Sequence, residues 1–139
     1  GLWNPDNGMK DLVINAWNYT PFFPESCTRC NEQILYLYDW ILRRDTGVRI
    51  GLFSSYYDRV IGTSFLDMQP EAFKNLLVST SGSIHAAHKK RFNRFLIEGD
   101  THCIGEVAAQ YSYTVKGVTL LQWITGLVTE DPAWSDLLE

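Results

Sequence analysis

The chain has 139 residues, of which 45% are hydrophobic and 14% aromatic, enough for one packed domain rather than a disordered chain. The formal net charge is -4 and the Lys and Arg residues are scattered, apart from the run 89–91 and Arg94, so nothing favours nucleic acid as a partner. No apolar run approaches the roughly 20 residues of a membrane-spanning helix, and we expect no membrane span.

The first third of the chain contains two predicted helices. Apolar residues recur at intervals of three and four over residues 6–19, which predicts a short amphipathic helix. The prolines of residues 20–24 end it in an aromatic-rich loop. A second helix is predicted over residues 31–44, where an apolar stripe lies on one face and Arg43 and Arg44 complement the C-terminal dipole.

The rest of the chain alternates between strand and helix. Strands are predicted over residues 48–53, a β-branched and aromatic run, and over residues 92–97. Helices are predicted over residues 70–89, with proline in the first turn, and over residues 117–128. Helix, strand, helix, strand, helix is the pattern of an α/β fold with a parallel sheet.

The predicted sheet is incomplete. Two parallel strands do not form a stable sheet by themselves, because parallel sheets are buried on both faces and need several strands. We therefore expect a bare edge on the strand at 48–53, to be covered by a second chain or an N-terminal segment. The chain starts without an initiator Met, a basic region or an apolar signal region, which suggests processing or trimming.

Titratable residues follow both predicted strands. Asp58 comes after the first strand and His102 after the second. Open α/β sheets bind ligands beyond the carboxyl ends of their strands, and an acid followed by a histidine is the chain order of the hydrolase triad after its serine. In that triad the imidazole takes the serine proton and the carboxylate fixes the imidazole tautomer. Solvated loop residues are the plainer interpretation, and Asp39 and Asp67 are weaker candidates for the acid.

Several runs resemble the C-terminal region of the pectin acetylesterase and Notum-like carboxylesterase family of α/β-hydrolases. They are YLYDWILR (36–43), FSSYYD (53–58), GDTH (99–102), GVTLLQW (117–123) and DPAWSD (131–136). The resemblance implies that residues 1–139 are the C-terminal segment of one α/β-hydrolase domain. It also implies that Asp58 is the triad acid and His102 the base of a serine esterase that needs no cofactor and acts on small esters or acylated carbohydrates.

The nucleophile of that family is missing from the sequence. The nearest match to its G-x-S-x-G pentapeptide, residues 62–66 (GTSFL), lacks the second glycine and follows the acid. We therefore expect the serine and the oxyanion hole in an N-terminal segment, present as a separate chain or removed, and we expect this chain alone to be inactive. A non-catalytic binding module derived from a hydrolase fold is the alternative.

The cysteines leave the compartment open. Cys27 and Cys30 could form a local disulfide or half of a zinc site, although no second half is present and we expect no metal site. Cys103 and the residue after it stand where the family typically has Thr-Phe, and we do not expect Cys103 to act as a nucleophile. Only the resemblance and a Cys27 to Cys30 bridge suggest an extracellular or periplasmic protein.

Two further groups of side chains are ambiguous. Trp17, Tyr19, Phe22 and Phe23 could line the mouth of the site and bind substrate, or they could be core residues. His85 and His88 are interpreted as polar residues near the C-terminal end of the helix at 70–89, without a metal motif.

Overall fold

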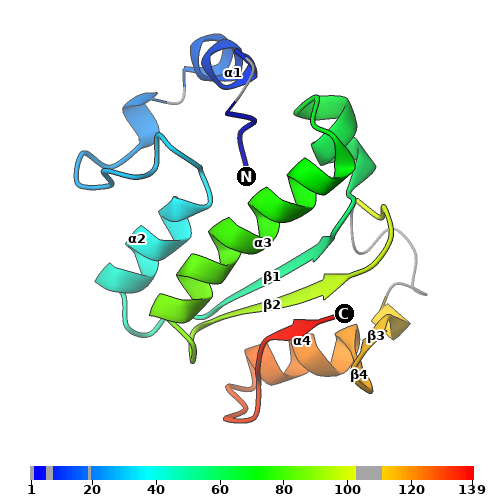
Figure 1. Ribbon diagram of the computed structural model, residues 1–139. Helices are drawn as coiled ribbons and strands as arrows, with labels where there is room; N and C mark the ends of the chain where they lie inside the picture. Colours follow the sequence, from blue (N-terminus) through cyan, green and yellow to red (C-terminus); the bar gives the residue numbers. More distant parts are fainter. Residues whose placement is uncertain (1, 6–7, 19, 103–110) are drawn as a thin grey trace.

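The computed structural model describes residues 2–5, 8–18, 20–102 and 111–139. They form a mixed α/β fold in which helices flank a small parallel sheet (Figure 1). The helical elements are α1 (Met9–Trp17), the 3-10 helix η1 (Thr20–Phe22), α2 (Tyr36–Arg44), the π-helix η2 (Arg59–Phe65), α3 (Pro70–Ala87) and α4 (Leu120–Val128). The strands are β1 (Ile50–Ser55), β2 (Phe92–Ile97), β3 (Thr114–Val115), β4 (Val118–Thr119) and β5 (Leu137–Leu138).

The main sheet contains three parallel strands in the order β1, β2, β5. β1 and β2 pair along their whole length, from Ile50 opposite Phe92 to Ser55 opposite Ile97. β5 pairs with the second half of β2 through Leu137 and its neighbour. β2 is therefore the central strand, and within the described part of the chain β1 has a neighbouring strand on one side only.

The two faces of the sheet carry separate parts of the core. Alternate side chains of a strand point to opposite faces, so Phe92 and Leu96 pack with α2 and α3. Phe95 and Ile97 pack on the other face with α4 and the segment that leads to β5. All six residues of β2 are buried, as expected for a strand covered on both faces.

The ends of several elements differ from the sequence prediction. The strand at Phe92–Ile97 is confirmed, whereas the first strand runs from Ile50 to Ser55 instead of over residues 48–53. The predicted helix at 31–44 begins only at Tyr36. Before it, the amide of Gln33 pairs with the backbone N–H and C=O of Trp3, which holds this part of the chain in turns against the N-terminal segment.

The last predicted helix begins three residues late because of a hairpin that the sequence analysis missed. β3 and β4 are joined by Lys116 and Gly117, which both have positive φ (52° and 81°), as a two-residue type I′ turn requires. Thr119 then caps α4, because its side chain accepts from the backbone N–H of Gln122 while Gln122 bonds back to the N–H of Thr119.

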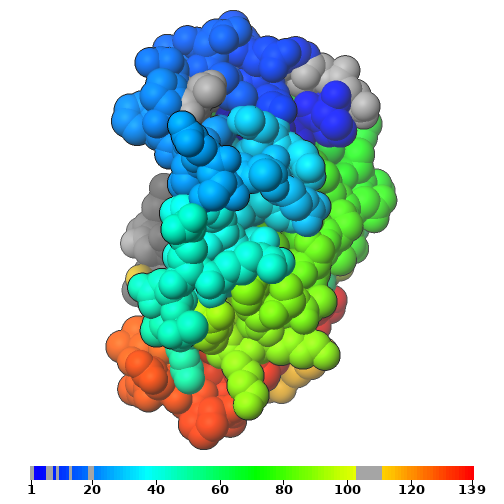
Figure 2. Space-filling view, turned by 90° about the vertical axis from the view of Figure 1, so that its left-hand side faces the viewer, coloured from blue at the N-terminus to red at the C-terminus, as the bar shows by residue number. Residues whose placement is uncertain are grey.

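The N-terminal segment and α4 lie at opposite ends of the molecule (Figures 1 and 2). α1 is closed by its C-cap residue Asn18, which adopts the left-handed conformation with φ 50°.

Among the described residues, no helix is both long enough and apolar enough to cross a membrane.

Candidate active site

Asp58 and His102 lie in loops that leave the same edge of the sheet, because β1 and β2 are parallel neighbours. Hydrogen bonds join the two loops. The backbone N–H of Tyr57 donates to the carbonyl of Gly99 (3.1 Å), and the hydroxyl of Ser55 donates to the carbonyl of Thr101 (2.5 Å). The backbone that carries both candidate residues is therefore fixed by the strand pairing that precedes them.

The two predicted catalytic side chains are in direct contact. The Nδ1 atom of His102 lies 2.9 Å from Oδ2 of Asp58. The second carboxylate oxygen of Asp58 accepts from the backbone N–H of Ile61 at 2.9 Å and caps η2. Both oxygens thus have defined partners, which holds the carboxylate in one orientation toward the imidazole.

The two side chains of this Asp58–His102 dyad differ in exposure to solvent. The Asp58 side chain is 6% exposed, whereas that of His102 is 34% exposed. An ionised carboxylate only accepts hydrogen bonds, so the proton of a neutral imidazole belongs on Nδ1 and the lone pair on Nε2. No second hydrogen bond to the His102 ring is present within the described ranges. The geometry therefore suits His102 to accept a proton at Nε2.

A second Asp–His pair occupies the opposite edge of the sheet. Nε2 of His88 lies 2.8 Å from Oδ1 of Asp39, which joins the end of α3 to α2. The His88 side chain is only 8% exposed, so this residue of the predicted polar helix end is enclosed rather than open. His85 is also bonded, through Nδ1 to the carbonyl of Phe92 (2.8 Å). Asp39, a weaker candidate for the triad acid, is therefore paired with a different histidine.

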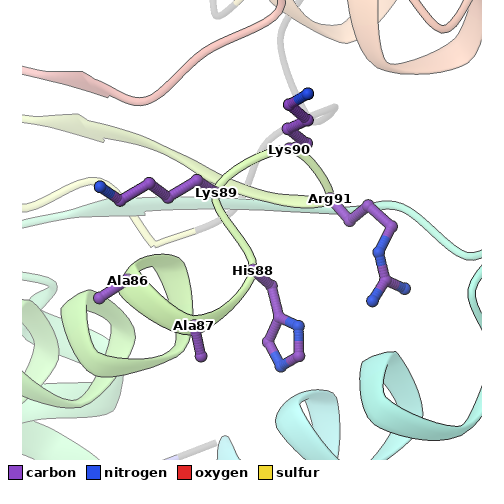
Figure 3. A pocket seen from close by; sticks show the side chains of 6 residues that line it. All are labelled: Ala86, Ala87, His88, Lys89, Lys90 and Arg91. Atoms are coloured by element: carbon purple, nitrogen blue, oxygen red, sulfur yellow. The ribbon is translucent and has the colours of Figure 1, made fainter.

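Charge around Asp39 favours its ionised form. Burial raises the pKa of Asp39, but hydrogen bonds from Arg43 and His88 lower it by more, so the pKa lies below its ordinary value. His88 and Arg91 point toward α2, whereas Lys89 and Lys90 point away from it (Figure 3).

Two surface hollows lie near these pairs. One, of about 350 Å³, is lined by residues 86–91 at the turn between α3 and β2, away from the dyad. The other, of about 300 Å³, is lined by residues 97–101, Tyr113, Thr114 and Glu139. This second hollow adjoins the loop that carries His102, although neither Asp58 nor His102 lines it.

The predicted substrate-binding aromatic residues lie on the N-terminal segment. Trp17 is 59% exposed and stacks on Phe65, the last residue of η2, at 6.5 Å between ring centroids. Since Asp58 caps the start of the same short helix, η2 connects Trp17 to the dyad. Phe22 is 75% exposed and Phe23 is half-buried, while Tyr19 lies outside the described residues.

The remaining candidates have other surroundings. Cys27 and Cys30 form a disulfide, and Cys103 lies outside the described residues. Gly62, in the weak match to the nucleophile motif, packs so closely on Phe73 that a Cβ atom would lie 2.8 Å from the ring. Packing explains this glycine without a nucleophile. Asp67 is exposed at a position of positive φ (51°) just after η2.

Sequence reasoning missed a polar cluster beside the dyad. Lys74 of α3 lies over the rings of Tyr56 and Tyr57, at 4.4 and 4.9 Å from their centroids, and donates to the Tyr57 hydroxyl at 3.0 Å. The hydrogen bond to Tyr57 raises the pKa of Lys74, as does its pairing with Glu98. The sequence offered no signal for this cluster, because it joins a helix to two loops.

No protein-family model, curated protein or solved structure matches the chain. The likeness of short runs to the carboxylesterase family therefore remains an expectation. What the structure shows is a mixed α/β fold and the contact between Asp58 and His102.

Proposed function

We propose that this chain supplies the acid and the base of a serine carboxylesterase, and that another segment of the hydrolase supplies the nucleophilic serine and the oxyanion hole. The observation that carries the proposal is the 2.9 Å hydrogen bond between Asp58 and His102 at the carboxyl edge of a parallel sheet. Ligand sites of open α/β sheets lie at this edge, and the order of acid and histidine along the chain is that of hydrolases.

In the proposed reaction, Nε2 of His102 takes the proton of the serine hydroxyl as its oxygen attacks the ester carbonyl. Asp58 stabilises the imidazolium that forms and keeps Nδ1 as the donor. His102 then gives the proton to the departing alcohol, which leaves an acyl-serine. Water attacks the acyl group in the second half, and its proton returns to the serine through His102, so that acid and alcohol are the only products.

Substrate and compartment belong to the same proposal. We infer that the substrate is a small ester or an acylated carbohydrate, and that the protein works outside the cell or in the periplasm. The Cys27–Cys30 disulfide supports an oxidising compartment. Flat aromatic side chains such as Phe22, at 75% exposure, are suited to stack on sugar rings.

The test compares two histidine variants of the protein as it is purified, together with any polypeptide that remains bound. Hydrolysis of p-nitrophenyl acetate is measured for His102→Asn and for the matched control His88→Asn, which breaks the other Asp–His pair. We expect the His102 variant to lose at least about 10³-fold in kcat. The His88 variant is expected to keep its kcat and to lose thermal stability.

Native mass spectrometry without reduction, with a fluorophosphonate label for activated serine, completes the test. A labelled polypeptide in the assembly that carries a G-x-S-x-G serine is the expected result. Normal hydrolysis by the His102 variant would remove this residue from the mechanism. A folded single chain without label or hydrolysis would contradict the esterase and leave the binding module.

A further inference from the structure

One backbone edge of β1 is left unpaired by the described residues. Ile50 and Tyr56 donate to carbonyls of the β2 segment (2.8 and 2.9 Å), so by strand alternation Gly51, Phe53 and Ser55 direct their backbone groups to the other side. Among the described residues, no strand pairs on that side. Five of the six β1 residues are only half-buried, whereas every residue of β2 is buried. This edge has the character of an interior strand that lacks its second neighbour.

An apolar stripe on α4 continues this edge. Leu121 (55% exposed), half-buried Ile124 and Val128 (75% exposed) follow one another at intervals of three and four residues. Leu127 and Trp123 contact Gly51 of β1.

The contacts of α4 also show on which side of the helix this stripe lies. Gly126 packs on Trp134, in the segment that leads to β5. Successive residues of an α-helix are rotated by about 100° around its axis. The stripe therefore lies past Leu127, on the side of the helix away from Gly126. The stripe therefore lies on the flank of α4 beyond β1, next to the free edge.

Arg49, directly before β1, has no counter-charge in the part of the chain that the structure describes. Its side chain is half-buried, its Nη1 atom is buried without a hydrogen-bond partner, and no ion pair forms to it among the described residues. Two residues before Gly51, it lies on the α4 side of the sheet by strand alternation. Guanidinium groups in such positions are usually paired with carboxylates, because an unpaired buried donor is unfavourable.

We propose that the free edge of β1, Arg49 and the stripe Leu121, Ile124 and Val128 form one docking surface for a further β-strand. The strand runs parallel to β1, carries apolar side chains at alternate positions, and places a carboxylate against Arg49. The inference rests on the proposed function in one respect, namely that this strand belongs to the polypeptide that supplies the serine. A parallel strand has its carboxyl end at the edge where His102 lies.

A second copy of this chain fits the surface less well. A two-fold axis would pair β1 with β1 in antiparallel orientation, so that each Arg49 would face the β1 segment of the other copy. Residues 50–57 contain no carboxylate. The charge of Arg49 thus selects an acidic strand from another segment over a copy of this one.

Photo-cross-linking of the protein in its own cells tests the surface. Val128 is replaced by p-benzoylphenylalanine, and Phe22 is replaced in the control. Both side chains are 75% exposed, and they belong to α4 and to the N-terminal segment, which lie at opposite ends of the molecule. We expect position 128 to cross-link to one segment with alternating apolar residues and an acidic residue. The Phe22 position is expected to give no cross-link to that segment.

Charge reversal then tests Arg49. We expect Arg49→Glu to weaken binding of the cross-linked polypeptide at least tenfold, and reversal of the acidic residue on that polypeptide to restore it. Lys10→Glu, the same charge change on α1 at the opposite end of the molecule from α4, is expected to have no effect.

The outcomes separate this inference from the esterase. A matching strand from a polypeptide that fluorophosphonate does not label would support the docking surface and overturn its link to the serine. Cross-links from position 128 to a second copy, or none above the Phe22 control, would overturn the docking surface. In that case the hydrolysis assay on His102→Asn still decides the function.

Discussion

At the scale of single residues, Asp58 has a separate partner for each carboxylate oxygen. Oδ1 caps η2 through the N–H of Ile61, and Oδ2 holds His102. Both bonds are needed to aim the imidazole, because the cap prevents the carboxylate from turning. The local fold and the proposed chemistry therefore depend on the same side chain.

Asp58→Asn separates these two roles. The amide oxygen can still accept from Ile61, so we expect the melting temperature to change by only a few degrees. The amide N–H2 that replaces Oδ2 cannot accept from Nδ1–H, and it favours the imidazole tautomer with its proton on Nε2. We therefore expect kcat to fall by about 10³- to 10⁴-fold, as for triad aspartates elsewhere. Steady-state hydrolysis and thermal unfolding measured by circular dichroism check both parts. A variant with normal kcat would contradict the role of Asp58.

Asp39 should make stability depend on pH. Its pKa is lower in the folded chain than in the unfolded chain, whose value is about 3.9, so its pairing stabilises the fold above that pH. The contribution is lost as pH falls below about 4 through the folded pKa. We expect the melting temperature of the wild type to fall more steeply between pH 5 and about pH 2.5 than that of Asp39→Asn. Equal slopes would show that the pairing contributes nothing.

Sequence reasoning found one Asp–His pair and missed the other for a physical reason. Asp58 and His102 follow two strands, and the carboxyl ends of neighbouring parallel strands meet at one edge. Asp39 and His88 meet because α2 packs on the end of α3. No comparable rule predicts which residues of two packed helices will touch.

At the scale of elements, the start of α4 was misplaced because two local signals compete. Apolar periodicity extends back to Val118, but Gly117 and Lys116 form the turn of a hairpin instead. Thr119 then ends β4 and caps α4 at once. Periodicity indicates that a helix exists, whereas turn and cap chemistry decides where it begins.

Thr119→Ala should therefore destabilise the protein. It removes the oxygen that accepts from the N–H of Gln122 and half of the capping box, at a cost of about 1 kcal/mol. Thr125→Ala, on an exposed face inside the same helix, is the control and should change the free energy of unfolding by less than about 0.5 kcal/mol. Urea denaturation of both variants gives the comparison. If both variants lose the same free energy of unfolding, the capping box does not stabilise α4.

At the scale of the whole molecule, Arg94 ties three parts of the chain together. From the central strand β2 its guanidinium bonds Asp136 through two nitrogens, the closest at 2.6 Å, and reaches the Val78 carbonyl and the Ser81 hydroxyl of α3 at 3.3 Å. Its own backbone N–H also donates to Asp136. The segment that leads to β5 is thus attached to the sheet through a nearly buried ion pair, in which the side chains are 7% and 16% exposed.

Asp136→Ala should leave the Arg94 guanidinium buried without its counter-charge and lower the free energy of unfolding by about 3 to 5 kcal/mol. The double variant Arg94→Met/Asp136→Leu removes both charges and should recover most of that loss, because apolar residues can replace a buried pair. Asp131→Asn, on the exposed turn before β5, is the control and should stay within about 0.5 kcal/mol of the wild type. Urea denaturation followed by tryptophan fluorescence gives the comparison, and Trp134 of this segment contributes to the signal. A double variant as unstable as Asp136→Ala would mean that the charge pair itself, and not the cost of an isolated guanidinium, holds β5 on the sheet.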